Sequence, residues 1–361
     1  MSRRNIHYWK CDRPAAFHGT QTRGEPDARI EQQLAEQLRE RFRAEHVELQ
    51  PAGSQGNHLT WTARVGDLDL FVRVENGPEL DQHLAVESAL LDRVRTAGVA
   101  TPRVFGCDAS RSRVPFAWQA LERVSFPDLN HWHRLGQLNA ERIAYDIGVN
   151  VARWQTIQTG GFGPFDLEHW RSDGGLAGYH ATYPDYFHLR LEEHLAFLVT
   201  KGFLSSAQRD DLRQAITKHT ALLALTQGCL VHRDLALWNI LGTADQIHAF
   251  IDFDDAISGD PMDDLSILAC FHDAAFLQRV FAGYTSLRPL PLNHRRRFWL
   301  HLLRNMIVKA VIRVGAGYFD RDNRFFLIGS GCSGADLRRF TEQRLALALR
   351  GLEQDAQLSC L

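Results

Sequence analysis

The sequence predicts an α+β protein in which a small antiparallel sheet precedes a larger, mostly helical region. Three observations lead to this fold class. The chain has 361 residues, which is long enough for two lobes with separate cores. Strand-like alternation concentrates between residues 58 and 122, and helical spacing dominates from residue 131 onward. We therefore divide the chain into a tail at 1–25, a small lobe at 26–126 and a helical lobe at 127–361.

The small lobe begins with a predicted helix over 27–45, where apolar residues recur every fourth position from Ile30 to Phe42. The stretches LTWTARV and LFVRV alternate and are joined at VGD, which predicts a β-hairpin that follows a Gly- and Ser-rich loop. A helix over 79–97 then ends at Gly98. The stretches TPRVFGCD and PFAWQALERV predict two further strands, and a hinge near 122–127 closes the lobe.

Helical patterns fill most of the remaining chain, including a stripe of Ile143, Ile147, Val151 and Trp154. They are interrupted by two short apolar runs, GCLVH and HAFIDF, which predict adjacent strands. A cleft between two lobes of this kind is a common place for a small ligand. The order of elements therefore directs attention to the residues that follow those two strands.

Composition narrows the class of partner. The chain is 45% hydrophobic and 23% charged, as in an ordinary globular protein. Its net charge of −2 argues against nucleic acid, because proteins that bind polyanions usually carry a basic excess. All but four of the 41 cationic residues are arginine, which we attribute to genomic composition. Six cysteines without metal spacing, no signal-peptide pattern and no membrane-length apolar run predict a cytoplasmic protein without a membrane partner.

The strongest chemical signal is HRDLALWN at 232–239, followed by IDFDD at 251–255. Phosphoryl transfer needs a carboxylate to accept the proton of the attacking hydroxyl, and oxygen ligands to hold a metal on the nucleotide phosphates. Asp234, Asn239 and Asp252 supply these groups. Because they follow two adjacent strands, we expect them to meet at one end of the cleft. The spaced set HxDxxxxN plus a later aspartate is the catalytic-loop signature of the kinase-like fold.

The chain departs from protein kinases after this point, because it reads IDFDDAISGDPMDDLSIL, without DFG or APE. It resembles the aminoglycoside phosphotransferase and choline kinase superfamily over roughly residues 50–345. The combination of GGFGPF, HRDLALWNIL and GDP is most similar to the hygromycin-type branch. The resemblance implies a protein-kinase-like two-lobed fold, Asp234 as catalytic base, and Asn239 and Asp252 as ligands of Mg²⁺. It also implies that His232 and Asp264 brace the catalytic loop.

A second set of residues concerns the nucleotide, ATP or GTP. Glu87 lies on the apolar stripe of its helix, where a carboxylate is costly unless paired, and Arg73 in FVRV is the expected partner. In kinases a Lys–Glu pair at these places holds the phosphates. The backbone of Ser54, Gln55 and Gly56 is expected to cover the phosphates. The resemblance places adenine against Glu122 and Val124.

The acceptor is left open by the sequence. Residues 160–200 mix acids, histidines, arginines and aromatic residues, without the excess of carboxylates that a polycationic aminoglycoside requires. We expect most of the aromatic residues to be core. A small hydroxylated molecule is predicted, either an antibiotic of the aminoglycoside type or a metabolite such as a sugar, an amino alcohol or a homoserine-like acceptor. A nucleotide-binding pseudokinase is a further alternative, and residues 1–25 could cap the small lobe or mediate a homodimer.

Overall fold

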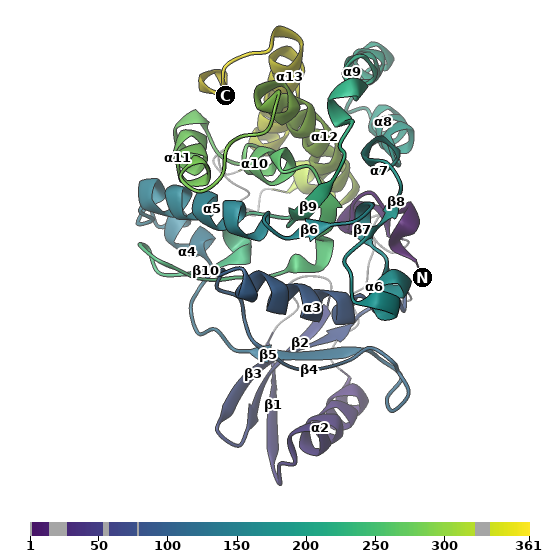
Figure 1. The fold of residues 1–361 in the computed structure, drawn as a ribbon, viewed down its shortest axis with the longest axis vertical. Helices are drawn as coiled ribbons and strands as arrows, with labels where there is room; N and C mark the ends of the chain where they lie inside the picture. The colour runs from purple at the N-terminus through teal and green to yellow at the C-terminus, as the bar shows by residue number, and fades with distance from the viewer. Residues whose placement is uncertain (1, 14–26, 53–57, 78, 322–332) are drawn as a thin grey trace.

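The computed structural model describes residues 2–13, 27–52, 58–77, 79–321 and 333–361, and it has the predicted two lobes (Figure 1). The small lobe is built on a five-stranded antiparallel sheet in the order β1-β2-β3-β5-β4. Its strands are β1 Val47–Pro51, β2 His58–Val65, β3 Leu68–Glu75, β4 Val104–Asp108 and β5 Trp118–Glu122. The predicted hairpin is β2–β3, and its turn contains Gly66 at a φ of 57°, a conformation that suits glycine.

Two helices pack on this sheet and have different tasks. Helix α2 (Ala28–Phe42) lies at the outer end, where its buried Leu34 and Leu38 join Trp61 in the core of the small lobe (Figure 1). Helix α3 (His83–Thr96) lies between the sheet and the helical lobe, and its buried Leu90 and Leu91 belong to the main core. Helix α3 therefore carries side chains into the space between the lobes.

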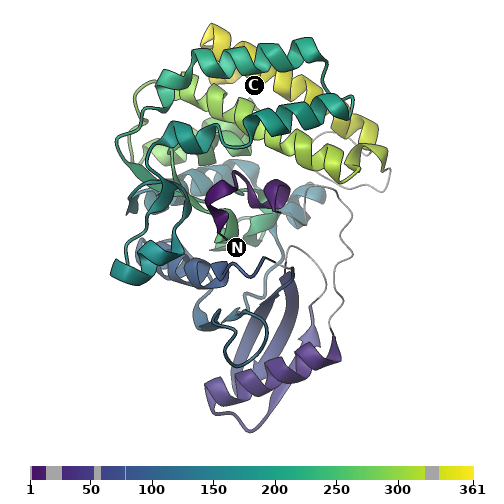
Figure 2. The same ribbon diagram turned by 90° about the vertical axis from the view of Figure 1, so that its right-hand side faces the viewer.

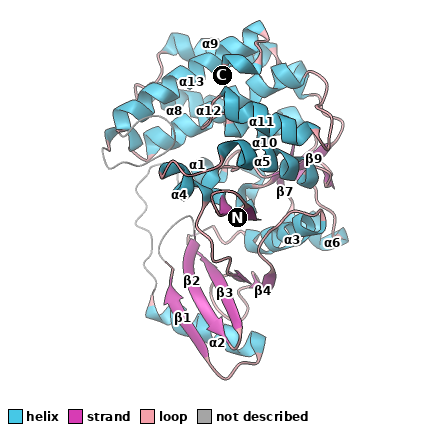
Figure 3. Ribbon diagram, turned by 90° about the vertical axis from the view of Figure 1, so that its left-hand side faces the viewer, coloured by secondary structure: helices cyan, strands magenta, loops and turns pink. Residues whose placement is uncertain are grey.

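Within the described ranges, the helical lobe contains ten α-helices, α4 to α13, together with the short helix α1 of the N-terminal segment and two small sheets (Figure 3). The sheets have the order β6-β9-β12-β7-β8 and β10-β11. The strands are β6 Gln158–Thr159, β7 Phe162–Phe165, β8 Gly178–His180, β9 Gly228–Val231, β10 Ile240–Gly242, β11 Ile247–Phe250 and β12 Ile257–Gly259. The helices are α4 Leu129–Arg134, α5 Ala140–Trp154, α6 Leu167–Asp173, α7 Tyr183–Phe187, α8 Leu191–Thr200, α9 Ser206–Lys218, α10 Met262–Leu268, α11 Ala274–Thr285, α12 His294–Gly315 and α13 Gly334–Gln354.

Helices α5 and α11 cross at two glycines. A Cβ atom at Gly148 would lie 1.9 Å from the carbonyl oxygen of Val280, and one at Gly283 would lie 1.9 Å from that of Tyr145. Only glycine lets the two backbones approach this closely. The crossing fixes Trp154 at the end of α5, a fully buried side chain that contacts the catalytic region.

The first residues form a bound segment and not a free tail. Residues 2–13 include a 3₁₀ turn, η1 (Arg3–Asn5), and the short helix α1 (Trp9–Asp12). In Figure 2 this segment, in dark purple, lies between the sheet-bearing lobe and the helical lobe. Tyr8 is 2% exposed and Trp9 6%, so both aromatic rings pack on the body. Among the described helices, none has the length and apolarity that crossing a membrane requires.

Candidate active site

The catalytic motif folds into a loop between β9 and the hairpin β10–β11. Asn239 donates through its Nδ2 atom to the backbone oxygen of Asp234 at 2.8 Å and to its Oδ2 atom at 3.0 Å. The Ile251 N–H donates to the Asn239 carbonyl at 3.0 Å, which brings Asp252 alongside. The structure thus gathers Asp234, Asn239 and Asp252 at one place, as their spacing suggested. Asp234 is 2% exposed, whereas the Asp252 side chain is 30% exposed and faces the cleft.

Asp264 and His232 hold the loop from behind. The Asp264 carboxylate accepts the backbone N–H groups of His232 and Arg233, both at 3.0 Å, and the indole N–H of Trp154 at 2.9 Å. Arg233 has a φ of 73°, so two carboxylate bonds at this point stabilise a backbone conformation that is unfavourable for arginine. The His232 ring, through Nε2, contacts the Ile251 carbonyl at 3.0 Å and so links the loop to the strand before Asp252.

The second predicted set also meets in the cleft. Arg73 on β3 donates to Glu87 on α3, and its Nε donates to Gln119 Oε1 at 3.0 Å. Gln119 in turn donates to Ser88 Oγ at 2.8 Å, which fixes its orientation. The Arg73 Nη1 atom lies 3.7 Å from Asp252 Oδ1. The guanidinium therefore lies between the buried Glu87 and the Asp252 carboxylate, at the wall of the cleft.

The Asp234 carboxylate has partners that its sequence context did not indicate. The Tyr8 hydroxyl donates to Asp234 Oδ1 at 2.6 Å, and the Lys10 ammonium donates to Asp234 Oδ2. Lys309 on α12 lies 3.3 Å from Oδ1, and Lys10 lies 3.6 Å from Asp252 Oδ2. Burial alone would raise the pKa of Asp234, but the two ammonium groups and the hydroxyl bond outweigh it and hold this pKa well below its usual range. Asp234 is thus firmly ionised at neutral pH.

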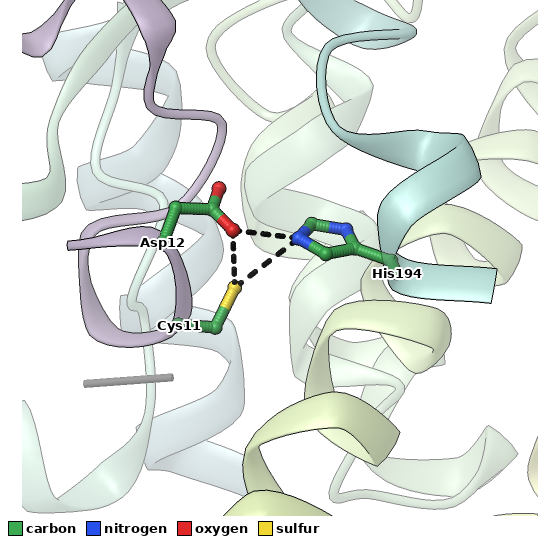
Figure 4. Close-up of side chains that lie close together, drawn as sticks. All are labelled: Cys11, Asp12 and His194. Carbon is green, nitrogen blue, oxygen red and sulfur yellow. Dashed lines mark hydrogen bonds and ion pairs between the residues drawn. The ribbon is translucent and has the colours of Figure 1, made fainter. Parts of the chain in front are cut away.

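The N-terminal segment is anchored next to these contacts by a buried cluster, Cys11, Asp12 and His194 (Figure 4). His194 Nε2 lies 2.6 Å from Asp12 Oδ1, and the Cys11 thiol donates to the same oxygen at 3.2 Å. The other oxygen of Asp12 accepts two backbone N–H groups of the preceding turn, each at 2.9 Å.

These three side chains offer ligand atoms within 4.8 Å of one another, which is a spacing that a metal could use. Two features argue instead for anchoring. Arg304 donates to the Nδ1 atom of His194 at 3.1 Å, which places a cation beside the cluster. Burial also raises the pKa of Cys11 well above its usual range, whereas a metal needs the thiolate. The bonds already satisfy the Asp12 carboxylate, so we interpret the cluster as an anchor.

A second anchor joins the segment to both lobes. Arg3 donates to Asp81, just before α3, at 2.6 Å and to Asp254, after the catalytic strands, at 3.0 Å. Its guanidinium stacks 3.7 Å from the Trp9 ring centroid. The Trp9 N–H donates to Asp255 Oδ1 at 3.1 Å. Because Asp81 and Asp254 belong to different lobes, Arg3 links them directly.

A cavity of about 850 Å³ lies between the lobes, and Lys10, Arg73 and Asp252 are among its lining residues. Glu122 and Val124 line it at the hinge, and Asp234 and Lys309 line it at the catalytic end. The Glu122 N–H already donates to the Arg103 carbonyl at 2.8 Å, whereas the Val124 N–H makes no bond within the described part of the chain. The Val124 N–H is therefore better placed than the Glu122 N–H to donate to a nucleobase. The predicted phosphate-loop residues Ser54, Gln55 and Gly56 lie outside the described residues.

Asp260 in GDP has a structural task. Its Oδ1 atom accepts the Met262 N–H at 2.8 Å, which stabilises the turn into α10. The carboxylate also forms a two-point bond with Arg297 at 2.9 and 2.6 Å and lies 3.0 Å from His301. Through Arg297 and His301, Asp260 thus holds the start of α12, the helix that carries Lys309.

The aromatic residues of the region 160–200 are mostly core. The side chains of Phe162, Phe165, Tyr183, Tyr186 and Phe187 are all buried. They pack in the main core and do not line the cavity. This agrees with the expectation that such residues pack more often than they stack on a ligand.

The missed partners of Asp234 had one signal in the sequence. Lysine occurs only at 10, 201, 218 and 309, and we attributed its scarcity to genomic composition. Two of these four lysines contact the catalytic carboxylate. In a chain so rich in arginine, the positions that keep lysine deserve separate inspection, because an ammonium and a guanidinium differ in shape and hydration.

Comparisons with known proteins agree with this geometry. The model of the phosphotransferase enzyme family matches residues 48–299. Among solved structures, aminoglycoside phosphotransferase APH(4)-Ia is similar, with a TM-score of 0.59 and 16% identity over 89% of this chain and 98% of that one. A putative fructosamine-3-kinase from Haemophilus somnus 129PT has a TM-score of 0.57 and 16% identity over 86% of this chain and 96% of that one.

A putative aminoglycoside phosphotransferase from Ralstonia eutropha JMP134 gives a TM-score of 0.59 and 17% identity, with 91% of this chain and 99% of that one covered. No curated protein matches the sequence. Identities this low establish the fold, and the family model, which spans more than half of the chain, establishes the family. The chain belongs to the phosphotransferase enzyme family and is a small-molecule kinase that phosphorylates hydroxyl groups.

Proposed function

We propose that this kinase transfers the γ-phosphoryl group of ATP or GTP to a hydroxyl of a small acceptor, with Asp234 as the base. The observation that carries this assignment is the Tyr8 hydroxyl, which donates to Asp234 Oδ1 at 2.6 Å. An acceptor hydroxyl would make the same bond. Its oxygen attacks the γ-phosphorus while the bond to the β-phosphate oxygen breaks. The nucleoside diphosphate leaves, and Asp234 takes the proton.

The residues present also fit a divalent cation. The Nδ2 atom of Asn239 donates to Asp234, so the side-chain oxygen Oδ1 of Asn239 remains for a ligand. Asp252 presents a half-buried carboxylate to the cleft. Oxygen ligands of this kind suit Mg²⁺, which when bound neutralises phosphate charge. Arg73, held by Glu87, would bind the phosphates, and the hinge at Glu122 and Val124 would bind the base.

Support for a nucleotide donor comes from a similar structure, a mutant of APH(4)-Ia solved with AMP-PNP and hygromycin B. For this chain the acceptor is open between an aminoglycoside-type antibiotic and a metabolite, namely a sugar, an amino alcohol or a homoserine-like molecule. The pseudokinase alternative rests on Arg73 in place of lysine. The complete set of Asp234, Asn239 and Asp252 argues against it.

The test is release of ADP or GDP in the presence of Mg²⁺ with a panel of aminoglycosides, other hydroxylated antibiotics, amino alcohols, sugars and amino acids. Asp234→Asn is the blank. We expect the variant to bind nucleotide like the wild type and to lose about 10²–10⁴-fold in turnover, which is the usual contribution of a general base. Wild-type turnover in this variant would show that Asp234 is not the base. Nucleotide binding without transfer to any acceptor or to water would favour the pseudokinase.

A further inference from the structure

The described carboxylates that line the cavity either face a cation or belong to the hinge segment. Within the described residues, five carboxylates line the cavity: Glu87, Glu122, Asp128, Asp234 and Asp252. Glu87 is paired with Arg73. Glu122 accepts the Arg103 N–H at 3.2 Å, and Asp128 accepts the His131 N–H at 2.9 Å. Asp234 and Asp252 belong to the proposed transfer machinery. Glu122 and Asp128 keep their negative charge, because one backbone N–H does not neutralise a carboxylate, and both belong to the segment 122–128 at the hinge.

A buried cation without a counter-charge also lines the cavity. Arg313 on α12 lines the cavity and is 3% exposed. Within the described part of the chain its guanidinium makes one hydrogen bond, from Nη1 to Thr341 Oγ1 at 2.7 Å, and no ion pair. Burial lowers the pKa of Arg313 to about 10, so the group stays charged at neutral pH. A buried charge without a partner is costly and suggests a function.

Three other buried arginines are satisfied by the protein itself, whereas Arg344, which is 8% exposed and forms no ion pair among the described residues, does not line the cavity. Arg233 pairs with Asp263 at 2.6 Å, and Arg297 pairs with Asp260. Arg304 forms no ion pair with a described carboxylate, but it makes three hydrogen bonds, to two carbonyl oxygens and to a histidine nitrogen. In these cases the protein itself satisfies the guanidinium. Arg313 has most of its donor capacity left over beside a cavity.

The position of Arg313 relates it to the reacting hydroxyl. Lys309 lies 3.1 Å from the Tyr8 hydroxyl oxygen, the atom that marks the acceptor position at Asp234. Arg313 follows Lys309 by four residues on the same helix, so it lies on the same face at a rise of roughly 6 Å. Phe271 and Ile312 give the cavity apolar walls beside these cations.

We propose that Lys309 and Arg313 form a subsite for an anionic group, a carboxylate or a phosphate, carried by the acceptor close to the hydroxyl that is phosphorylated. The inference rests on the proposed function and specifies its substrate class as hydroxy acids or sugar phosphates. The guanidinium forms charge-assisted bonds with the anion, and Lys309 adds a second positive charge nearer to the reacting oxygen. A polycationic aminoglycoside would meet only repulsion at this subsite.

The experiment compares acceptors that differ only in charge: D-glycerate, sn-glycerol 3-phosphate, glycerol and 3-amino-1,2-propanediol, with Mg²⁺ and ATP. The readout is the ratio of kcat/KM for each charged acceptor to that for glycerol. Hydrogen bonds to charged groups contribute about 1.5–3 kcal/mol, so we expect an anionic acceptor to be preferred by about 10- to 150-fold. Preference for glycerate or for glycerol phosphate separates the two anions.

Three variants test whether Arg313 causes this preference. Arg313→Met should bring the ratio close to one. Arg339→Met, on the exposed face of α13, is the matched control and should keep the wild-type ratio. Thr341→Val removes the hydrogen bond to Arg313, together with the bond from the Thr341 hydroxyl to the Leu337 carbonyl, and should also keep most of the preference. Preference for the neutral or the cationic acceptor, or equal losses for all four acceptors in Arg313→Met, would overturn the proposal.

Thermal unfolding answers the question even if none of the four molecules is phosphorylated. Removal of an unpaired buried cation should raise the Tm, so we expect Arg313→Met to melt above the wild type. D-Glycerate or glycerol phosphate should raise the Tm of the wild type but not that of the variant. A variant that melts lower, by as much as Thr341→Val, with no response of the wild type to either anion, would make Arg313 a structural residue. Failure of nucleotide binding would instead contradict the proposed function.

Discussion

Replacement of Asp234 by asparagine should destabilise the protein, and the magnitude follows from its four donors. Tyr8, Lys10, Lys309 and Asn239 all donate to the carboxylate. An amide accepts with one oxygen only and carries no charge, so both ammonium groups lose their counter-charge. Hydrogen bonds to charged groups contribute about 1.5–3 kcal/mol each. Lys10 is 27% exposed and can recover water, whereas Lys309 is 9% exposed and cannot.

We therefore expect a net loss of about 2–4 kcal/mol. With an unfolding entropy of about 2.1 cal/mol/K per residue, 361 residues give roughly 0.76 kcal/mol/K, so the Tm should fall by about 3–5 °C. The assay is calorimetric unfolding at neutral pH. Asp210→Asn is the control, because this carboxylate on α9 is 47% exposed and its loss should cost under about 0.5 kcal/mol.

The pH dependence gives a second check. The pKa of Asp234 is lowered in the folded state, so its contribution is present above the unfolded pKa of about 3.9 and is lost as pH falls toward the folded value. The Tm difference between wild type and variant should be constant above about pH 5 and should shrink below about pH 4. A variant that melts at or above the wild type, or a difference that is unchanged in acid, would refute the reasoning.

Three further predictions concern neighbours of the site. Tyr8→Phe frees Asp234 Oδ1, so the KM for the acceptor should fall while stability drops by about 0.5–1.5 kcal/mol; unchanged values of both, in kinetics and in melting, would contradict the contact. Glu87→Gln removes the charge that holds Arg73, and we expect the KM for ATP to rise with little change in the acceptor KM, measured in steady-state kinetics. Asp264→Asn leaves the Arg233 N–H without an acceptor, so kcat should fall about 10- to 100-fold while nucleotide affinity, measured by calorimetry, stays constant; equal losses in both would indicate global unfolding.

The sequence was sufficient to predict the parts of the site that depend on the spacing of residues along the chain. The run HRDLALWN and the later Asp252 follow strands, so their spacing alone brings three side chains together. The pairing of Arg73 with Glu87 was also foreseeable, because a carboxylate on an apolar helix stripe needs a cation nearby. Local pattern and tertiary structure agree at these places.

The contacts of the N-terminal segment could not be foreseen in the same way. Tyr8 and Lys309 are 301 residues apart, and nothing in the periodicity around Tyr8 indicates a distant partner. The segment is polar, yet its polar groups are buried and bind other buried polar groups, as Asp12 does with His194. Composition alone does not distinguish such a segment from one that is solvated.

The position of the first residues in the cleft has a consequence for biosynthesis. At about 5–20 residues per second, a ribosome makes Lys309 roughly 15–60 s after Tyr8, because 301 residues separate them. During this time Ile6, Tyr8 and Trp9 leave the ribosome without the surfaces that later bury them. The Asp234 carboxylate, which binds Tyr8, is made roughly 11–45 s after Tyr8, because 226 residues separate them. A bulky N-terminal fusion should therefore slow the appearance of the finished cleft more than that of the folded lobes.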